Sequence, residues 1–187
     1  MKSKSKRERL RSDAFFALGI VGMLVLVFTV SFITFGTFTQ RSLFFLGAVI
    51  LFLVAVESRQ NTLAAIEIVA LAGVSLSFFL LPFDITIVAM TIVVAIMLAY
   101  FVSIGHYKKH EIELLGTAGF IILAFGYAFN SGNFEFLTSF LFVLGAVVVS
   151  AYSLFMWLVY KIRVQAIWFV LNVAFMISPL MLFLSLV

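Results

Sequence analysis

The stretch Leu43–Val49 reads LFFLGAV and Leu141–Val147 reads LFVLGAV, so six of seven positions are identical at an offset of 98 residues. A second pair of segments precedes this pair at an offset of 97 residues. It matches Leu18, Gly19, Gly22, Leu26, Phe28 and Phe32 with Leu115, Gly116, Gly119, Leu123, Phe125 and Phe129. Because a single inserted residue separates the two pairs, we interpret them as one duplicated unit. Small residues repeated at helical spacing favour close helix packing, which accounts for the glycines.

The composition is that of an integral membrane protein. The chain has 187 residues, of which 65% are hydrophobic and 11% are charged, and its mean hydropathy is +1.26. A soluble domain needs more polar surface than this. Long apolar runs predict membrane-spanning helices, and they lack the alternation of apolar and polar residues that barrel strands show. The chain has no cysteine, which excludes disulfides, thiolate metal sites and thiol nucleophiles.

Breaks in hydrophobicity predict a single all-α membrane domain with seven transmembrane helices. They cover Ala14–Phe38, Ser42–Glu57, Leu63–Leu81, Phe83–Ile104, Ile112–Phe129, Phe134–Tyr160 and Val164–Val187. A signal peptide has an apolar region of about 7–15 residues that ends in small residues. The first run is longer and has no such end, so we expect it to be retained as a helix.

Basic residues predict the orientation. With the N-terminus inside, Arg41 alone lies outside, which is a strong positive-inside bias. The inner residues are Lys2, Lys4, Lys6, Arg7, Arg9, Arg11, Arg59, Lys108, Lys109, Lys161 and Arg163. We therefore expect a cell-membrane protein with a cytoplasmic N-terminus and an outer C-terminus. The basic arm should bind anionic lipid headgroups, and Trp157 and Trp168 should lie near the inner interface. Topology explains the positive charge, so no nucleic-acid partner is expected.

The offset between the matching segments, which we call the sequence echo, predicts the direction of the repeats. It spans four helices, so the matching helices cross the membrane in the same direction and the repeats are parallel. The chain then divides into a basic cytoplasmic arm (1–12), a first three-helix unit (14–81), a linker helix (83–104) and a second three-helix unit (112–187). The echo is strong in the first two helices of each unit and fades in the third.

This arrangement resembles the SWEET sugar transporters and the PnuC vitamin transporters in helix count, repeat direction and length, over essentially the whole chain. The resemblance implies two parallel three-helix bundles around a central path, with a linker helix that orients the second bundle. The Pro-Gln pair typical of SWEET bundles is absent, because the only prolines are Pro82 and Pro179. In SWEETs an asparagine in the third helix of each bundle faces the substrate. The matching helices here carry Glu67 and Asn172.

Glu67 and Asn172 are the candidates for substrate binding or proton coupling. Glu67 lies about one turn inside the inner end of its helix, where a carboxylate costs several kcal/mol unless it is paired, protonated or hydrated. It either faces a solute path or reaches the interface to meet Arg59 or Lys161. Asn172 lies at a depth of about 12 Å, from a rise of 1.5 Å per residue. It either binds a polar solute or joins two helices through a hydrogen bond.

Other polar residues give weaker signals. Ser31, Thr34 and Thr37 share one face of the expected first helix, as Ser150 and Ser153 do in the sixth, and these hydroxyls either line a polar path or bond to their own backbone. Gln60 and Gln165 are expected at the inner ends of their helices.

The cluster His106, His110, Glu111 and Glu113 is the one set with metal-ligand spacing. It lacks a glutamate between the histidines and contains two lysines, so we interpret it as a solvated inner loop. We expect no metal and no cofactor.

Two functions follow from these observations. The first is a transporter or facilitator for a small polar solute, with a central site between the bundles. The alternative is a non-catalytic structural or accessory subunit of a larger membrane complex, which the 24 phenylalanines and the sparse polar interior would suit. A homo-oligomer fits either function. No catalytic set converges in the sequence, so an enzyme is the weakest hypothesis.

Overall fold

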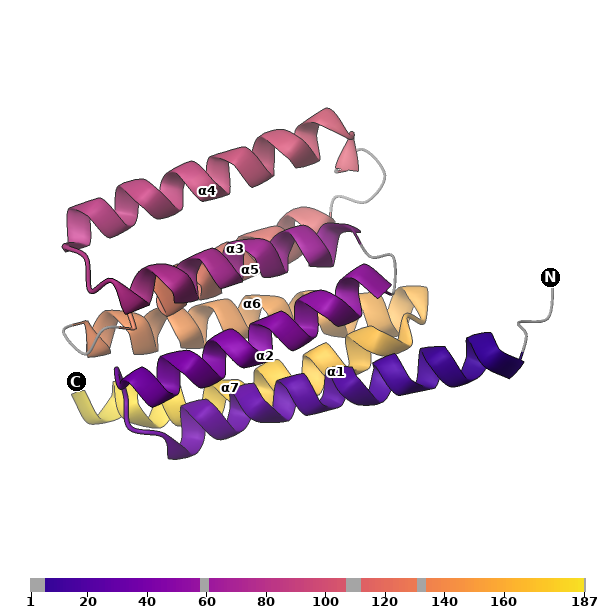
Figure 1. Cartoon of the computed structure of the whole chain (residues 1–187), viewed down its shortest axis with the longest axis horizontal. Helices are drawn as coiled ribbons and strands as arrows, with labels where there is room; N and C mark the ends of the chain where they lie inside the picture. The colour runs from indigo at the N-terminus through magenta and orange to yellow at the C-terminus, as the bar shows by residue number, and fades with distance from the viewer. Residues whose placement is uncertain (1–5, 58–60, 107–111, 131–133, 187) are drawn as a thin grey trace.

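The computed structural model describes residues 6–57, 61–106, 112–130 and 134–186, and these residues form seven α-helices (Figure 1). They are α1 (Lys6–Phe32), α2 (Phe38–Glu57), α3 (Asn61–Phe78), α4 (Phe83–Ser103), α5 (Ile112–Ala128), α6 (Glu135–Tyr160) and α7 (Arg163–Leu186). The all-helical class and the number of helices are therefore confirmed. The arm 1–12 lies partly outside the described residues.

Five of the described helices are long and apolar enough to cross a membrane. They are α1 from Asp13, α2, α4, α6 and α7 from Gln165. The apolar parts of the other two, Leu63–Phe78 in α3 and Ile112–Ala128 in α5, are shorter. At 1.5 Å per residue a helix of this length covers about 25 Å, slightly less than a bilayer core. Hydrophobic side chains such as Phe32, Ile96 and Val170 point outward from the bundle.

The boundary between the first two helices differs from the expectation. The sequence predicted a helix to Phe38, but α1 ends at Phe32 and α2 already begins at Phe38. Gly36 has a φ of 71°, a left-handed conformation that a continuous helix does not contain. Thr34 and Thr37 lie in this connection rather than on α1. The predicted hydroxyl face with Ser31 is therefore wrong.

Arg41 holds the connection between α1 and α2 in place. Its guanidinium donates to the carbonyl oxygens of Gly36 at 3.0 Å, Thr37 at 3.3 Å and Ser77 at 2.6 Å. Ser77 lies in the last turn of α3, where unpaired carbonyls carry partial negative charge. The side chain also lies 5.8 Å from the ring centre of Phe78. The one basic residue expected outside thus joins three chain segments.

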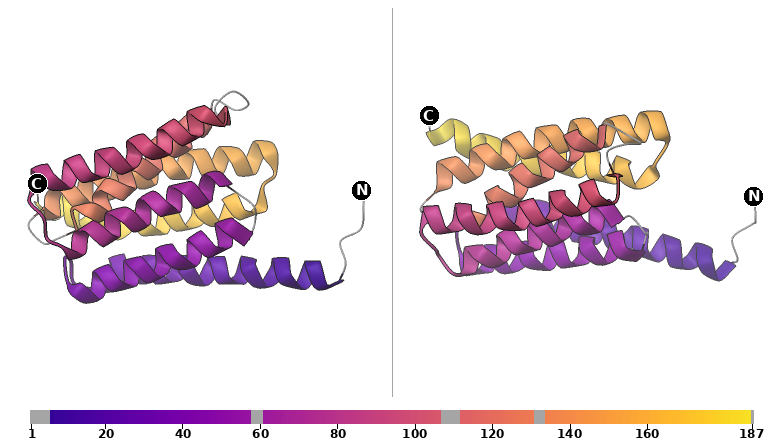
Figure 2. Two further views of the ribbon diagram at one scale, coloured as in Figure 1. Left: turned by 45° about the horizontal axis from the view of Figure 1, so that its top comes forward. Right: turned by 90° about the horizontal axis from the view of Figure 1, so that it is seen from above.

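Six of the helices form a closed ring. Contacts join α1 to α2, α2 to α3, α3 to α5, α5 to α6, α6 to α7, and α7 back to α1 (Figure 2). Of the described helices, α4 contacts only α3 and α5, and it lies along one side of the bundle (Figure 1). Helix directions alternate, so the bundle has an N end, where α1 begins, and a C end, where α7 ends.

Glycines bring α1 and α2 into close contact. A Cβ atom on Gly22 would lie 2.7 Å from Cγ2 of Ile50 and 3.3 Å from Cδ2 of Leu51. One on Gly47 would meet the side chain of Leu26, and would lie 3.2 Å from the carbonyl oxygen of Gly22. These distances are shorter than van der Waals contacts, so a larger residue at either glycine would separate the helices.

The same pattern joins α5 to α6. A Cβ atom on Gly119 would lie 2.9 Å from Cγ1 of Val148 and 2.7 Å from Cγ2 of Val149. One on Gly145 would lie 2.7 Å from Cγ of Leu123. Each contact is the counterpart of one between α1 and α2, at an offset of 97 residues in the first helix and 98 in the second. The glycines of both echoed segments therefore lie where the paired helices are closest.

We predict that Gly119→Ala destabilises the protein by about 1–3 kcal/mol, the usual effect of adding a methylene group to a full core. The added methyl would also lie 2.9 Å from the backbone nitrogen of Val149, which cannot move as a side chain can. Gly19→Ala is the matched control, because its Cβ would lie 3.5 Å from Val54. Unfolding by denaturing detergent in mixed micelles, followed by circular dichroism, measures both. Equal stability of the two variants would contradict the packing described here.

Candidate functional site

A small cavity lies inside the ring, and both candidate residues line it. Its volume is about 40 Å³, counted as the space that the centre of a water molecule can occupy. Residues of α1, α2, α3, α5 and α7 form its wall: Met23, Leu26, Val27, Ala48, Leu51, Glu67, Ala70, Phe120, Leu123, Tyr127, Trp168, Leu171, Asn172 and Phe175. Glu67 and Asn172 lie in corresponding helices of the two predicted units and are brought to one cavity.

Glu67 is buried in this wall. Its side chain is only 3% exposed, so it points into the bundle rather than toward the outer surface. Arg59, one of the two partners expected at the interface, lies outside the described residues. No described residue forms a hydrogen bond or ion pair with its carboxyl group. Tyr127 of α5 lines the same wall. Among the described residues, the carboxyl is the single charged group on this wall.

Asn172 does not join two helices through its amide nitrogen. Nδ2 donates to the carbonyl oxygen of Trp168, one turn earlier in α7, at 2.8 Å. This bond fixes the amide against its own helix, and it leaves the side-chain oxygen as the acceptor on a residue that lines the cavity. Trp168 is itself buried, at 7% exposure, and lines the same wall. Nothing in the sequence indicated this burial against neighbouring helices, and the position of Trp168 near the inner interface stays a prediction.

Four aromatic rings close the cavity toward the C end. Phe44 and Phe142 have ring centres 5.9 Å apart, and Tyr127 and Phe175 complete the group at 5.1 Å from Phe44 and 5.2 Å from Phe142 respectively. Edge-to-face packing of this kind is favourable beyond the area that it buries. Phe44 and Phe142 are the second residues of LFFLGAV and LFVLGAV. The sequence predicts close helix packing at the glycines of these segments. It gives no sign that their phenylalanines meet at the centre of the ring.

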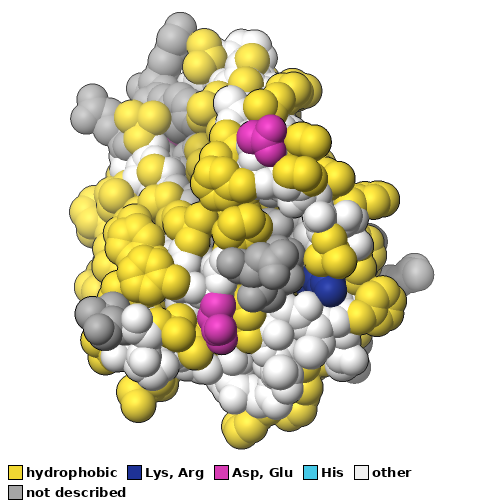
Figure 3. All heavy atoms as spheres, turned by 90° about the vertical axis from the view of Figure 1, so that its left-hand side faces the viewer, with side chains coloured by type: hydrophobic (Ala, Val, Ile, Leu, Met, Phe, Trp, Pro, Cys, Tyr) yellow, Lys and Arg dark blue, Asp and Glu magenta, His cyan; other side chains and the backbone are white. Residues whose placement is uncertain are grey.

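A larger hollow opens on the other side of these rings. We call it the C-end vestibule; it is lined by residues 30–35, Gln40, the start of α6 and residues 178–185 of α7, and it measures about 530 Å³. Phe142 forms part of its wall, together with Glu135 and Ser139. Figure 3 looks onto the C end, where hydrophobic side chains dominate and few charged groups are visible. The aromatic group thus separates the vestibule from the cavity.

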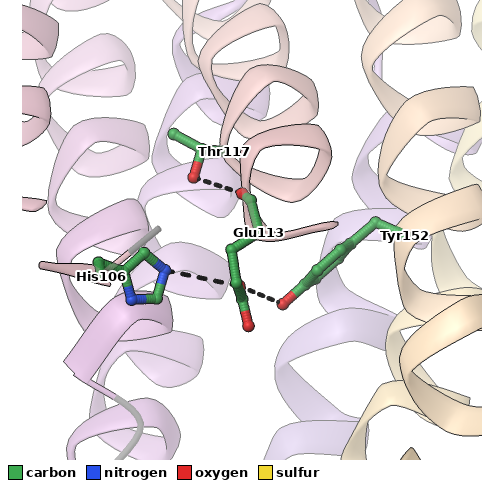
Figure 4. A network of polar contacts seen from close by, with 4 residues as sticks. All are labelled: His106, Glu113, Thr117 and Tyr152. Atoms are coloured by element: carbon green, nitrogen blue, oxygen red, sulfur yellow. Dashed lines mark hydrogen bonds and ion pairs between the residues drawn. The ribbon is translucent and has the colours of Figure 1, made fainter. Parts of the chain in front are cut away.

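The histidine cluster has a structural role in the described part of the chain. Oη of Tyr152 donates to Oε2 of Glu113 at 2.7 Å, and Nε2 of His106 lies 3.6 Å from the same oxygen (Figure 4). These contacts connect the end of α4 to α5 and α6. His110 and Glu111 lie outside the described residues. Within the described residues no three His, Cys, Asp or Glu side chains are grouped to hold a metal ion.

Several hydroxyl and amide groups are buried elsewhere. Gln165 lies in the first turn of α7, at the end of its helix as predicted; it is 3% exposed, and its Oε1 has no hydrogen-bond partner among the described residues. Ser150 and Ser153 are also buried without partners for their hydroxyl oxygens, and they do not line the cavity. Gln60 lies outside the described residues. No protein family, curated protein or solved structure matches the chain.

We predict that the two tryptophans report different environments. The Trp157→Phe variant retains Trp168, which should emit at shorter wavelength and resist quenching by acrylamide because it is buried. The Trp168→Phe variant retains Trp157, which is 38% exposed and should be quenched more readily if the quencher partitions to the detergent interface. Fluorescence in detergent micelles measures both. Stronger quenching of Trp168 than of Trp157 would contradict the burial of Trp168 in the cavity wall.

Proposed function

We propose that this protein is a membrane transporter or facilitator for a small polar solute, with its binding site in the cavity between Glu67 and Asn172. The observation that carries the proposal is that these two residues, from α3 and α7, line one cavity inside the helix ring. A buried carboxyl without a protein partner is costly in an apolar bundle, and such groups commonly serve solute or proton pathways.

The membrane position of the protein is part of the proposal. Five long apolar helices and an outward-facing hydrophobic surface support it. Of the basic residues that the structure describes, those at the start of α1, Lys161 and Arg163 lie at the N end, and Arg41 lies at the C end. The positive-inside bias then places the N end in the cytoplasm and the vestibule outside. The solute would enter from the vestibule. In this conformation the four aromatic rings would keep a solute in the vestibule from reaching the cavity.

The parallel repeat is supported by two features of the packing. First, the glycine contacts of α1 with α2 recur between α5 and α6 at the offsets of the sequence echo. Second, exchanging α1 with α5, α2 with α6 and α3 with α7 leaves the contacts of the ring unchanged. Phe44 and Phe142 are equivalent in this exchange and touch each other. The two units would rock about this centre, as the resemblance to SWEET and PnuC transporters implies.

The alternative function, an accessory subunit of a membrane complex, is favoured by one observation. A groove of about 500 Å³ runs over the outer surface between α2, α3 and α4, and it is lined almost entirely by apolar residues. Such a surface suits either lipid or another membrane helix. Native mass spectrometry after mild extraction separates the two functions. A partner chain that copurifies in fixed ratio would favour the subunit.

We predict that Glu67→Gln and Asn172→Ala each abolish solute uptake, because each removes a polar group from the cavity wall. Uptake of a panel of small labelled polar solutes into proteoliposomes measures this. Asp84→Asn in the first turn of α4 is the matched control, since Asp84 lines neither hollow. Circular dichroism and gel filtration would show that all variants fold. Uptake that survives both cavity substitutions would exclude this site.

Labelling of single-cysteine variants tests the predicted topology. The chain has no cysteine, so each variant carries a single thiol. Ser185→Cys at the end of α7 should react with a membrane-impermeant thiol reagent added to intact cells. Ser103→Cys at the end of α4 should react only after the membrane is opened. Both serines are exposed, so accessibility within the protein does not decide the result. The reverse pattern would invert the proposed orientation.

A further inference from the structure

We infer that the solute is a small organic cation, an amine in its ammonium form. This inference rests on the proposed function and names the substrate class of the same site. It follows from the charges along the path, the unpartnered carboxyl, the aromatic wall and the size of the cavity.

The charges along the path have one sign. Among the described residues, Glu67 is the only charged residue that lines the cavity, and Glu135 is the only one that lines the vestibule. No lysine, arginine or histidine of the described chain lines either hollow. Two carboxylates with no basic residue between them attract cations and repel anions. Anionic solutes such as carboxylates and phosphates therefore do not suit this path.

The carboxyl of Glu67 has no partner among the residues that the structure describes. It is buried, and no described residue forms a hydrogen bond or ion pair with it. An unpaired buried carboxylate costs several kcal/mol, and a cation placed beside it removes most of that cost. Ser139 offers a second unpartnered group, since its buried hydroxyl oxygen lines the vestibule and has no hydrogen-bond partner. An ammonium bound in the cavity would supply both the charge and the N–H donors that Glu67 lacks. An ammonium in the vestibule would supply an N–H donor to Ser139.

Aromatic rings form much of the remaining wall. Phe120, Tyr127, Trp168 and Phe175 all line the cavity with Glu67. The faces of such rings attract ammonium groups. The side-chain oxygen of Asn172 accepts N–H donors, and one N–H of the same amide is held by the carbonyl oxygen of Trp168. A carboxylate, an amide oxygen and several rings together match an ammonium group.

The size of the cavity limits the solute. A single water needs about 10–15 Å³ of such volume, so about 40 Å³ holds only a few water-sized groups. A methylated ammonium fits this space, whereas a sugar does not fit it in this conformation. Methylammonium is therefore the probe of choice, and methanol is its uncharged counterpart.

Binding is tested in the Trp157→Phe protein, in which Trp168 on the cavity wall is the only tryptophan. Methylammonium should change its fluorescence with saturation, whereas equal concentrations of methanol or acetate should not. Glu67→Gln should weaken binding at least tenfold, and Asp84→Asn should leave it unchanged. Tyr127→Phe keeps the ring and should retain affinity. Tyr127→Leu removes the ring and should weaken binding about two- to fivefold.

Uptake of labelled methylammonium into proteoliposomes, against protein-free vesicles, completes the test. Saturable binding that requires Glu67, in variants shown to fold by circular dichroism, supports the inference. Equal binding by the wild-type and Glu67→Gln proteins, or uptake of a neutral or anionic solute without any binding of methylammonium, overturns it. In the second case the transporter function stands. Binding of methylammonium without uptake of any solute supports the cation site and overturns the transporter function.

Discussion

A carboxyl group buried in an apolar helix bundle is the constraint on which this structure depends. Glu67 is enclosed by α3 and its neighbours, and no described side chain neutralises it. Packing alone would favour an apolar residue at this position, because a buried carboxyl destabilises a bundle unless it is protonated or paired. The cavity beside it, the amide of Asn172 and the aromatic wall give the carboxyl a setting in which a ligand or a proton can take the place of a partner.

Close helix packing makes this setting possible. Gly22 and Gly119 let the first two helices of each half approach until side chains of one contact the backbone of the other. Gly73 does the same between α3 and α5, where an added Cβ would meet the carbonyl oxygen of Ala124. These close contacts join α1 to α2, α5 to α6 and α3 to α5. The cavity lies at the centre of the ring that these helices form with α7. The third helices of the two halves differ in sequence and contribute the polar residues to that space.

The sequence predicted the class, the number of helices and the two polar residues of the cavity, because hydrophobic runs and isolated intramembrane polar groups are local signals. It could not predict which faces meet. Phe44 and Phe142 were visible as an echo, but their contact across the ring depends on how the halves dock. The sequence placed Trp168 and Gln165 near the start of α7, but their burial depends on the neighbouring helices and could not be predicted. The end of α1 was missed because Ile33–Thr37 contains no charged residue and no proline that would mark a break in the apolar run.

The account connects one cavity, one carboxyl and one solute, and infrared difference spectroscopy of the reconstituted protein tests that connection most directly. Spectra recorded with and without methylammonium show which carboxyl groups change their protonation or hydrogen bonding when the solute binds. The account predicts a carboxyl band that changes on addition of methylammonium and is absent from the spectrum of the Glu67→Gln variant. A difference spectrum that is the same in the wild-type and Glu67→Gln proteins would contradict it.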